Sequence, residues 1–338
     1  MLNILKTLCS LNGVSGWEDA VSDFIYNQAV PYADEISKDS IGNIFVFKKG
    51  EKSTSAPLML CAHMDEVGII IKSITDEGYL KFGFIGGVDR RVVIGKRVKV
   101  CGKYPGLIGV KAVHLSTKDE RKSVPKTQDL YIDIGATSKE QAEKLVSPGD
   151  YAVFDSDFRT FGDGYVKARA LDDRVGCAIM LTLLKESLPV DTHFVFTVQE
   201  EVGLRGATVA ANRVNPHSAL VLEGTTAADI PEMEGALQVC HLGNGPVIGC
   251  MDRSTIYDKE YLAKMFSLAN AAGISCQTKK LIAGGTDAGI IHKSGSGVRT
   301  TSISAPIRYI HSPASVARIS DIEDMLKLAR LFLENWEV

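Results

Sequence analysis

Apolar positions along the chain follow two patterns, which predict two kinds of structure. In the first sixty or so residues and again from about residue 165, amphipathic helices alternate with short, continuously apolar segments such as residues 57–62 and 192–198. Such segments are typical of strands covered on both faces, and their alternation with helices is typical of an α/β sheet. The other expected strands are residues 35–36, 43–47, 165–170, 218–222, 275–278 and 299–305.

Helices are expected where apolar residues recur with helical spacing. A helix from Ser15 to about Pro31 begins with the spacing of Ser15 and Glu18 that indicates a capping box. The remaining expected helices are residues 2–11, 175–184, 206–211, 259–271 and 319–336.

Between about residues 69 and 162 the pattern changes to short alternating runs separated by Gly and Asp turns. The runs are residues 69–71, 79–85, 97–101, 107–113, 130–134 and 151–154, with one helix at 138–145. Many short strands at this spacing predict a small β-barrel or sandwich. We therefore expect an α/β domain formed by residues 1–66 and 164–338, with residues 67–163 inserted as a β-rich domain.

Composition limits the class of protein. A length of 338 residues suggests two domains, and a net charge of −3 without long Lys/Arg runs argues against a nucleic-acid partner. No segment approaches the roughly 20 apolar residues of a membrane span, and residues 1–11 lack the apolar core of a signal peptide. The seven scattered cysteines include no C-x-x-C pair, as expected for buried thiols in a reducing cytoplasm.

Residues that can bind metals recur at the ends of the predicted elements. The strand at 57–62 leads into His63 and Asp65, and the strand at 192–198 leads into Glu200 and Glu201. Three further positions of this kind are Asp172, Glu223 and His311. Each residue alone has an ordinary explanation, such as a helix cap or a solvated loop. Their joint placement favours a common site, because the carboxyl ends of strands meet in one crevice of an α/β sheet.

The residue types indicate which metals such a site would bind. Two imidazoles with several carboxylates suit zinc, cobalt or manganese better than magnesium, which prefers oxygen ligands alone. Five ligands exceed the three protein ligands of a typical catalytic zinc, but they fit two ions bridged by one carboxylate. Of two adjacent glutamates, one can bind metal while the other faces the reacting water.

Several motifs together resemble the tetrahedral (TET) aminopeptidases, cytosolic metallopeptidases that include glutamyl aminopeptidases and proteins sometimes labelled cellulases. They occur in the family's order and span nearly the whole chain: residues 63–68 (HMDEVG), 170–176 (ALDDRVG), 199–203 (QEEVG), 284–288 (GGTDA) and 310–312 (IHS). The resemblance implies an α/β/α metallopeptidase domain with an inserted, barrel-like dimerisation domain. It also implies a homo-oligomer built from dimers, often a hollow dodecamer, that acts on peptides with a free amino terminus.

The resemblance also implies roles for the candidate residues. Asp172 would bridge two divalent ions, with His63 and Glu223 completing one site and Glu201 and His311 the other. Asp65 would orient His63, and Glu200 would be the general base. The sequence departs from many relatives at Glu223, where they have Asp. A role for Glu223 as a simple turn cap therefore remains open.

Two other classes of function remain as alternatives. A glycoside hydrolase also uses paired carboxylates, but that function gives His63 and His311 no role. A non-catalytic scaffold stabilised by metal would need no free base at Glu200. No H-E-x-x-H, G-x-S-x-G or Walker motif is present. We therefore expect a cytoplasmic metallo-aminopeptidase whose inserted domain serves assembly and not the chemistry.

Overall fold

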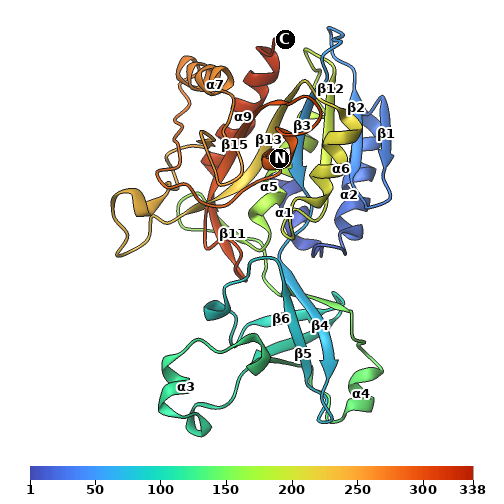
Figure 1. Cartoon of the computed structure of the whole chain (residues 1–338), viewed down its shortest axis with the longest axis vertical. Helices are drawn as coiled ribbons and strands as arrows, with labels where there is room; N and C mark the ends of the chain where they lie inside the picture. Colours follow the sequence, from blue (N-terminus) through green and yellow to red (C-terminus); the bar gives the residue numbers. More distant parts are fainter. Residues whose placement is uncertain (338) are drawn as a thin grey trace.

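The computed structural model describes residues 1–337 and has two parts (Figure 1). The larger part is a mixed sheet of ten strands covered by helices, and the smaller part is a closed antiparallel barrel of six strands. The order in the large sheet is β1-β2-β12-β3-β13-β15-β16-β11-β10, with β14 paired to β15. The expected fold class, an α/β protein with an inserted barrel, is confirmed.

The strands of the large sheet are short at its edges and longer at its centre. Their bounds are β1 Glu35–Lys38, β2 Ile44–Lys48, β3 Leu58–His63, β10 Arg159–Phe161, β11 Tyr165–Ala168, β12 Thr192–Thr197, β13 Ser218–Ala227, β14 Val247–Ile248, β15 Arg299–Arg308 and β16 Ser315–Arg318. The four central strands, β12, β3, β13 and β15, are parallel. Their carboxyl ends therefore lie along one edge of the sheet.

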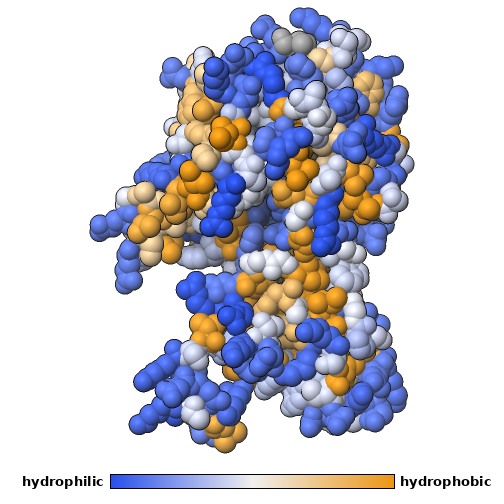
Figure 2. All heavy atoms as spheres, in the orientation of Figure 1, coloured by the Kyte–Doolittle hydropathy of each residue, from blue (hydrophilic) through white to orange (hydrophobic). Residues whose placement is uncertain are grey.

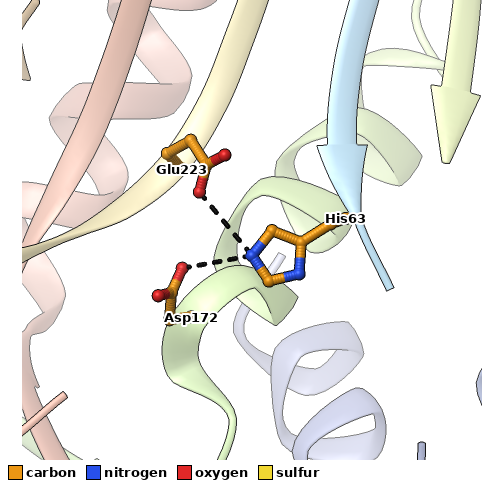
Figure 3. Close-up of side chains that lie close together, drawn as sticks. All are labelled: His63, Asp172 and Glu223. Atoms are coloured by element: carbon orange, nitrogen blue, oxygen red, sulfur yellow. Dashed lines mark ion pairs between the residues drawn. The ribbon is translucent and has the colours of Figure 1, made fainter. Parts of the chain in front are cut away.

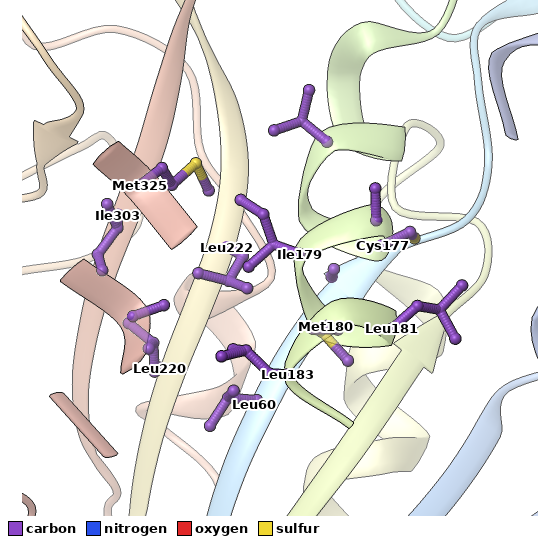
Figure 4. Close-up of a cluster of buried hydrophobic side chains, with 14 of the residues drawn as sticks. Leu60, Cys177, Ile179, Met180, Leu181, Leu183, Leu220, Leu222, Ile303 and Met325 are labelled. Carbon is purple, nitrogen blue, oxygen red and sulfur yellow. The ribbon is translucent and has the colours of Figure 1, made fainter. Parts of the chain in front are cut away.

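Helices cover both faces of this sheet because successive side chains of a strand point to opposite faces. Leu58, Leu60 and Ala62 of β3 belong to the core shared with α1, α2, α5, α7 and α9, whereas Met59 and Cys61 belong to the core shared with α6 and α8. Figure 4 shows the first of these cores around α5. The helices are α1 Leu2–Ser10, α2 Asp19–Ala29, α5 Leu171–Leu183, α6 Arg205–Val214, α7 Lys259–Ala271, α8 Ala288–Ile291 and α9 Ile319–Glu334.

The barrel closes in the order β4-β5-β8-β7-β6-β9 and has a hydrophobic core of its own. All six alternating runs of the sequence correspond to its strands: β4 Gly68–Ile74, β5 Leu80–Ile85, β6 Arg97–Val100, β7 Tyr104–Gly109, β8 Tyr131–Asp133 and β9 Tyr151–Phe154. Two short helices, α3 Lys118–Lys122 and α4 Lys139–Glu143, lie on the loops of this part. The chain enters the barrel directly after β3 and returns to the large sheet at β10 and β11.

Three local expectations were wrong. Ser15 and Glu18 form no capping box, since α2 begins at Asp19 without a side-chain cap. Residues 275–278 form only an isolated bridge through Gln277 and not a strand. β13 continues to Ala227, so Glu223 lies within the strand and not after its end.

No helix among the described residues is both long enough and apolar enough to cross a lipid bilayer.

Candidate functional site

The carboxyl ends of β3 and β12 bring the first candidate residues together. These strands are parallel, and His63 is paired in register with Thr197, three residues before Glu200. Neighbouring β13 contributes Glu223, whose side chain is almost fully buried. All seven residues selected from the sequence lie in this region of the sheet.

The first cluster consists of His63, Asp172 and Glu223 (Figure 3). Nε2 of His63 lies 3.5 Å from Oδ1 of Asp172 and 3.7 Å from Oε2 of Glu223. The three residues come from β3, from the start of α5 and from β13. An ion among these atoms would have one nitrogen and two oxygen ligands.

The second cluster consists of Asp172, Glu201 and His311. Nε2 of His311 lies 3.6 Å from Oδ2 of Asp172 and 3.2 Å from Oε2 of Glu201. Asp172 therefore turns one carboxylate oxygen toward each histidine. This is the geometry expected of a carboxylate that bridges two ions.

The backbone around Asp172 is adapted to this position. Asp172 has an extended conformation inside the first turn of α5, its peptide bond to Asp173 is cis, and the preceding Ala170 has a positive φ of 54°. The N–H of Gly224 donates a hydrogen bond to Oδ1 of Asp172 over 3.1 Å. A methyl group at Gly224 would lie 2.7 Å from that same oxygen. Glycine at position 224 therefore makes room for Asp172.

The contacts of His63 determine which of its nitrogens faces the carboxylates. Nδ1 lies 3.1 Å from the backbone oxygen of Asp65 and 3.4 Å from its Oδ1. Both oxygens accept, so Nδ1 carries a proton. A neutral His63 then presents the lone pair of Nε2 to Asp172 and Glu223, an arrangement that calls for a cation between them. A metal-binding histidine is commonly held by such a contact on its other nitrogen.

The carboxylate of Asp65 also holds the two glutamates. Its Oδ1 accepts a hydrogen bond from the N–H of Glu200 over 2.9 Å, and its Oδ2 accepts one from the N–H of Glu201 over 3.1 Å. The turn reaches this geometry because Gln199 adopts a positive φ of 56°, which costs a non-glycine residue about 1–3 kcal/mol. Oε2 of Glu200 then lies 3.9 Å from Nε2 of His63.

Ser15 and Glu18 contact the residues of the site. The sequence did not predict this role for them. The hydroxyl of Ser15 donates to Oδ2 of Asp65 over 2.6 Å, and Oε1 of Glu18 accepts from the N–H of Gln199 over 3.1 Å. Burial raises the pKa of Glu18 to about 7. The spacing of these residues indicated a helix cap, and only their long-range contacts reveal that they support the turn at Glu200.

The electrostatics of the site show a shortage of positive charge. Burial raises the pKa of Glu223 and of Glu200 well above the usual range, and their acidic neighbours raise both further. Burial opposes protonation of His311, but Asp172 and Glu201 raise its pKa to about 10. A site of this composition is best neutralised by bound cations.

The barrel also approaches the site. A methyl group at Gly87 would lie 3.4 Å from Nδ1 of His311, and one at Gly86 would lie 3.4 Å from Cβ of Glu201. Beside this contact is a cavity of about 520 Å³. Its wall consists of Asp89, Arg91, Val92 and Lys96 from the barrel and of residues 226–228, 230, 309–310 and 312–314 from the larger part. None of the seven site residues lines this cavity directly, nor a second cavity of about 560 Å³ between α1 and residues 153–158. Asp172, Glu201 and His311 line a much smaller space of about 20 Å³.

Comparison with known proteins shows similarity along almost the entire chain. A profile of the family described as M42 glutamyl aminopeptidase matches residues 42–328. A protein of Acetivibrio thermocellus, provisionally assigned as an aminopeptidase, is 40% identical over 330 residues, which are 97% of each chain. The lysyl aminopeptidase of Pyrococcus furiosus is 31% identical in an alignment of 345 positions, which covers 98% of this chain and 96% of the relative.

Solved structures show the same similarity. A TET aminopeptidase from a marine sediment archaeon of the Thaumarchaeota has a TM-score of 0.95 at 35% identity, covering 100% of this chain and 96% of the other. The TET1 peptidase of Pyrococcus horikoshii, which can assemble into a tetrahedron or a large octahedral shell, has a TM-score of 0.87 at 35% identity over 99% of each chain. A Thermotoga maritima protein described as an endoglucanase has a TM-score of 0.81 at 36% identity over 98% of this chain and 96% of its own.

Proposed function

The chain belongs to the family of M42 glutamyl aminopeptidases, and we propose that it removes the first residue of peptides with two divalent metal ions bridged by Asp172. Family membership establishes the general activity, that of a metal-dependent aminopeptidase. The observation that supports a dinuclear centre is the position of Asp172 between two histidines, with a different oxygen 3.5–3.6 Å from each.

The residues present fit such a centre. His63 Nε2 and Glu223 Oε1 are both buried and have no hydrogen-bond partner among the described residues. Unpaired buried polar atoms are costly, and a cation would satisfy them. We propose that His63, Asp172 and Glu223 hold one ion and that Asp172, Glu201 and His311 hold the other. The mixture of nitrogen and oxygen ligands favours zinc or cobalt, with manganese as a further candidate.

Glu200 is the proposed general base. A pair of divalent ions at this place would lower the pKa of a water molecule and polarise the carbonyl of the scissile bond. Glu200 belongs to neither ligand cluster, yet its carboxylate faces His63 from 3.9 Å. It can therefore accept the proton of the attacking water and pass it to the leaving amine. Asp65 supports this role by holding the backbone of Glu200 and Glu201.

The cavity lined by Ile310 and Ser312, the chain neighbours of His311, is the proposed place of the first side chain of the substrate. Asp89 and Arg91 pair with each other at 2.6 Å, so their charges largely cancel. The remaining charged side chain of the wall is the exposed Lys96. A single positive charge there favours an acidic or neutral side chain over a basic one.

We also propose that the chain assembles with copies of itself. Large apolar side chains are exposed on the projecting loops between β13 and α7 and on the outer loops of the barrel, and Figure 2 shows apolar atoms over the lobe that projects from the larger part. The most exposed are Leu237, Ile256, Val113 and Leu115. Surfaces of this kind mark protein contacts. A dimer that builds a dodecamer is the proposed assembly, in line with the TET structures.

Metal removal and replacement test the proposed function. Chelated protein should lose hydrolysis of aminoacyl reporter substrates, and zinc, cobalt or manganese should restore it with two ions per chain. Activity in metal-free protein would contradict a metal centre, and one ion at full activity would contradict a dinuclear one. Cleavage of a β-glucan by chelated protein would instead support the glycoside hydrolase. Metal binding without any hydrolysis would support the scaffold.

A further inference from the structure

Asp287 lies close to the site but belongs to neither ligand cluster. It directly precedes α8 and is 1% exposed. Its Oδ2 accepts a hydrogen bond from the hydroxyl of Thr197 over 2.6 Å and a weaker one from the thiol of Cys61 over 3.6 Å. Its Oδ1 is buried with no partner among residues 1–337. Burial raises the pKa of Asp287 to about 6, which shows how poorly this carboxyl is solvated.

Thr197, the partner of Asp287, is the last residue of β12. It lies opposite His63 in the register, and its backbone oxygen accepts a hydrogen bond from the N–H of Met64 over 2.7 Å. Its hydroxyl also approaches the backbone oxygen of Ala62 at 3.3 Å, but a hydroxyl has one proton, and the shorter contact is to Asp287. Asp287 therefore fixes the side chain of Thr197, the residue after which the chain leaves β12 and turns toward Glu200.

A closely packed loop holds Asp287 in place. Gly285 and Gly289 flank it, and a methyl group at these positions would lie 2.9 Å and 2.2 Å from the hydroxyl oxygen of Ser254. Ser254 is fixed in turn by Asp252, which accepts hydrogen bonds from its N–H and its hydroxyl. Glycine at positions 285 and 289 thus allows α8 to approach this loop. This packing fixes the position from which Asp287 accepts the hydrogen bond of Thr197 in β12.

The backbone from Val198 to Glu201 is held at every residue by a side chain. Asn43 accepts from Val198, Glu18 from Gln199, and Asp65 from Glu200 and Glu201. These contacts bind the amides of the turn, whereas Asp287 binds the strand end that precedes it. We propose that Asp287 is a positioning residue, which uses the Thr197 hydroxyl to fix the end of β12 against β3 and so keeps Glu200 opposite His63. The inference rests on the proposed role of Glu200 as the base.

Substitutions of both partners test this inference in the full-length, metal-loaded protein. Asp287→Ala and Thr197→Val should each lower kcat about 10- to 100-fold, since small displacements of catalytic groups have effects of this size. KM should stay within about twofold, and both metal ions should remain bound. The double variant should be no slower than the worse single variant, because both changes remove one interaction. Thr197→Ser keeps the hydroxyl and should retain most of the wild-type kcat.

Asp321→Ala is the matched control. Asp321 is equally buried and accepts hydrogen bonds from the N–H groups of Gly243 and Gly245, away from the site. The Asp321→Ala substitution should lower the melting temperature and leave kcat per folded molecule unchanged. If Asp287→Ala and Thr197→Val behaved in the same way, Asp287 would be structural only and the inference would be overturned. Loss of a metal ion in these variants would overturn it too, because Asp287 would then act on the ligands.

Hydrogen exchange gives a measurement that does not depend on activity. The amides of residues 198–203 should exchange faster in Asp287→Ala and Thr197→Val than in the wild type and in Asp321→Ala. Unchanged exchange would overturn the inference even if the protein is an aminopeptidase. If the wild type hydrolysed no peptide, the proposed function would fail, and the exchange result would still decide whether Asp287 holds the turn.

Discussion

Replacing Glu200 by Gln separates the general base from its neighbouring ligand. The substitution keeps the shape of the side chain and removes its negative charge. Glu200 lies 3.9 Å from His63 Nε2 and outside both ligand clusters, so the variant should keep two metal ions. Glu201→Gln is the matched comparison, because Glu201 Oε2 lies 3.2 Å from His311 Nε2 within a cluster. It should lose an ion as well as activity.

The size of the effect follows from the role of a base. Loss of a general base lowers kcat by about 10²- to 10⁴-fold, which at about 1.4 kcal/mol per factor of ten corresponds to roughly 3–6 kcal/mol of activation free energy. KM should change little, because the base acts on the attacking water and not on the bound peptide.

The same substitution should not weaken the metal-free protein. Burial raises the pKa of Glu200 well above its usual value, with Asp287 and Glu201 adding to the effect. A carboxyl with a raised pKa in the folded state contributes stability below its unfolded pKa and loses it as pH rises through the folded pKa. At any pH above its unfolded pKa, Glu200 therefore lowers the stability of the metal-free fold. Glu200→Gln should equal or exceed the wild type in melting temperature after chelation.

Three measurements check the assignment: kcat on an aminoacyl reporter, metal content per chain, and the melting temperature of chelated protein. Wild-type kcat in a fully loaded Glu200→Gln protein would refute the role of Glu200 as the base. If Glu200→Gln lost metal while Glu201→Gln remained loaded, the two roles would have to be exchanged.

Three further predictions concern the first metal ligand set, the substrate cavity and the assembly. Glu223→Ala should remove one metal ion per chain, and two tightly held ions in this variant would show that the ligand lies elsewhere. Glu223→Asp should change the metal affinity more than it changes the melting temperature. Lys96→Glu should lower the ratio of kcat/KM for Glu over Lys reporters by about 2- to 5-fold, as expected for an exposed charge worth about 1 kcal/mol or less. Lys96→Met should be intermediate, and an unchanged ratio would exclude Lys96 from specificity. Light scattering should find a dimer or larger assembly at micromolar concentration, most simply a dodecamer, and a fully active monomer would refute the assembly.

The sequence by itself determined most elements of this protein and the residues that gather at its candidate site. Hydrophobic periodicity reports which face of each element is buried, so it predicted the central strands, most helices and all six barrel strands. Ligand-type side chains near the ends of buried strands marked the crevice, because parallel strands present their carboxyl ends along one edge. These are properties of neighbouring residues in the chain, and a single sequence contains them.

Only the tertiary structure decided which residues meet. Ser15 and Glu18 have the spacing of a helix cap, yet they bind Asp65 and Gln199 from distant parts of the chain. Asp287 meets Thr197 across 90 positions of the sequence. Gly86 and Gly87 of the barrel come to lie beside Glu201 and His311. Local patterns contain no information on such pairs, because the sheet order and the packing of the barrel against the sheet bring them together.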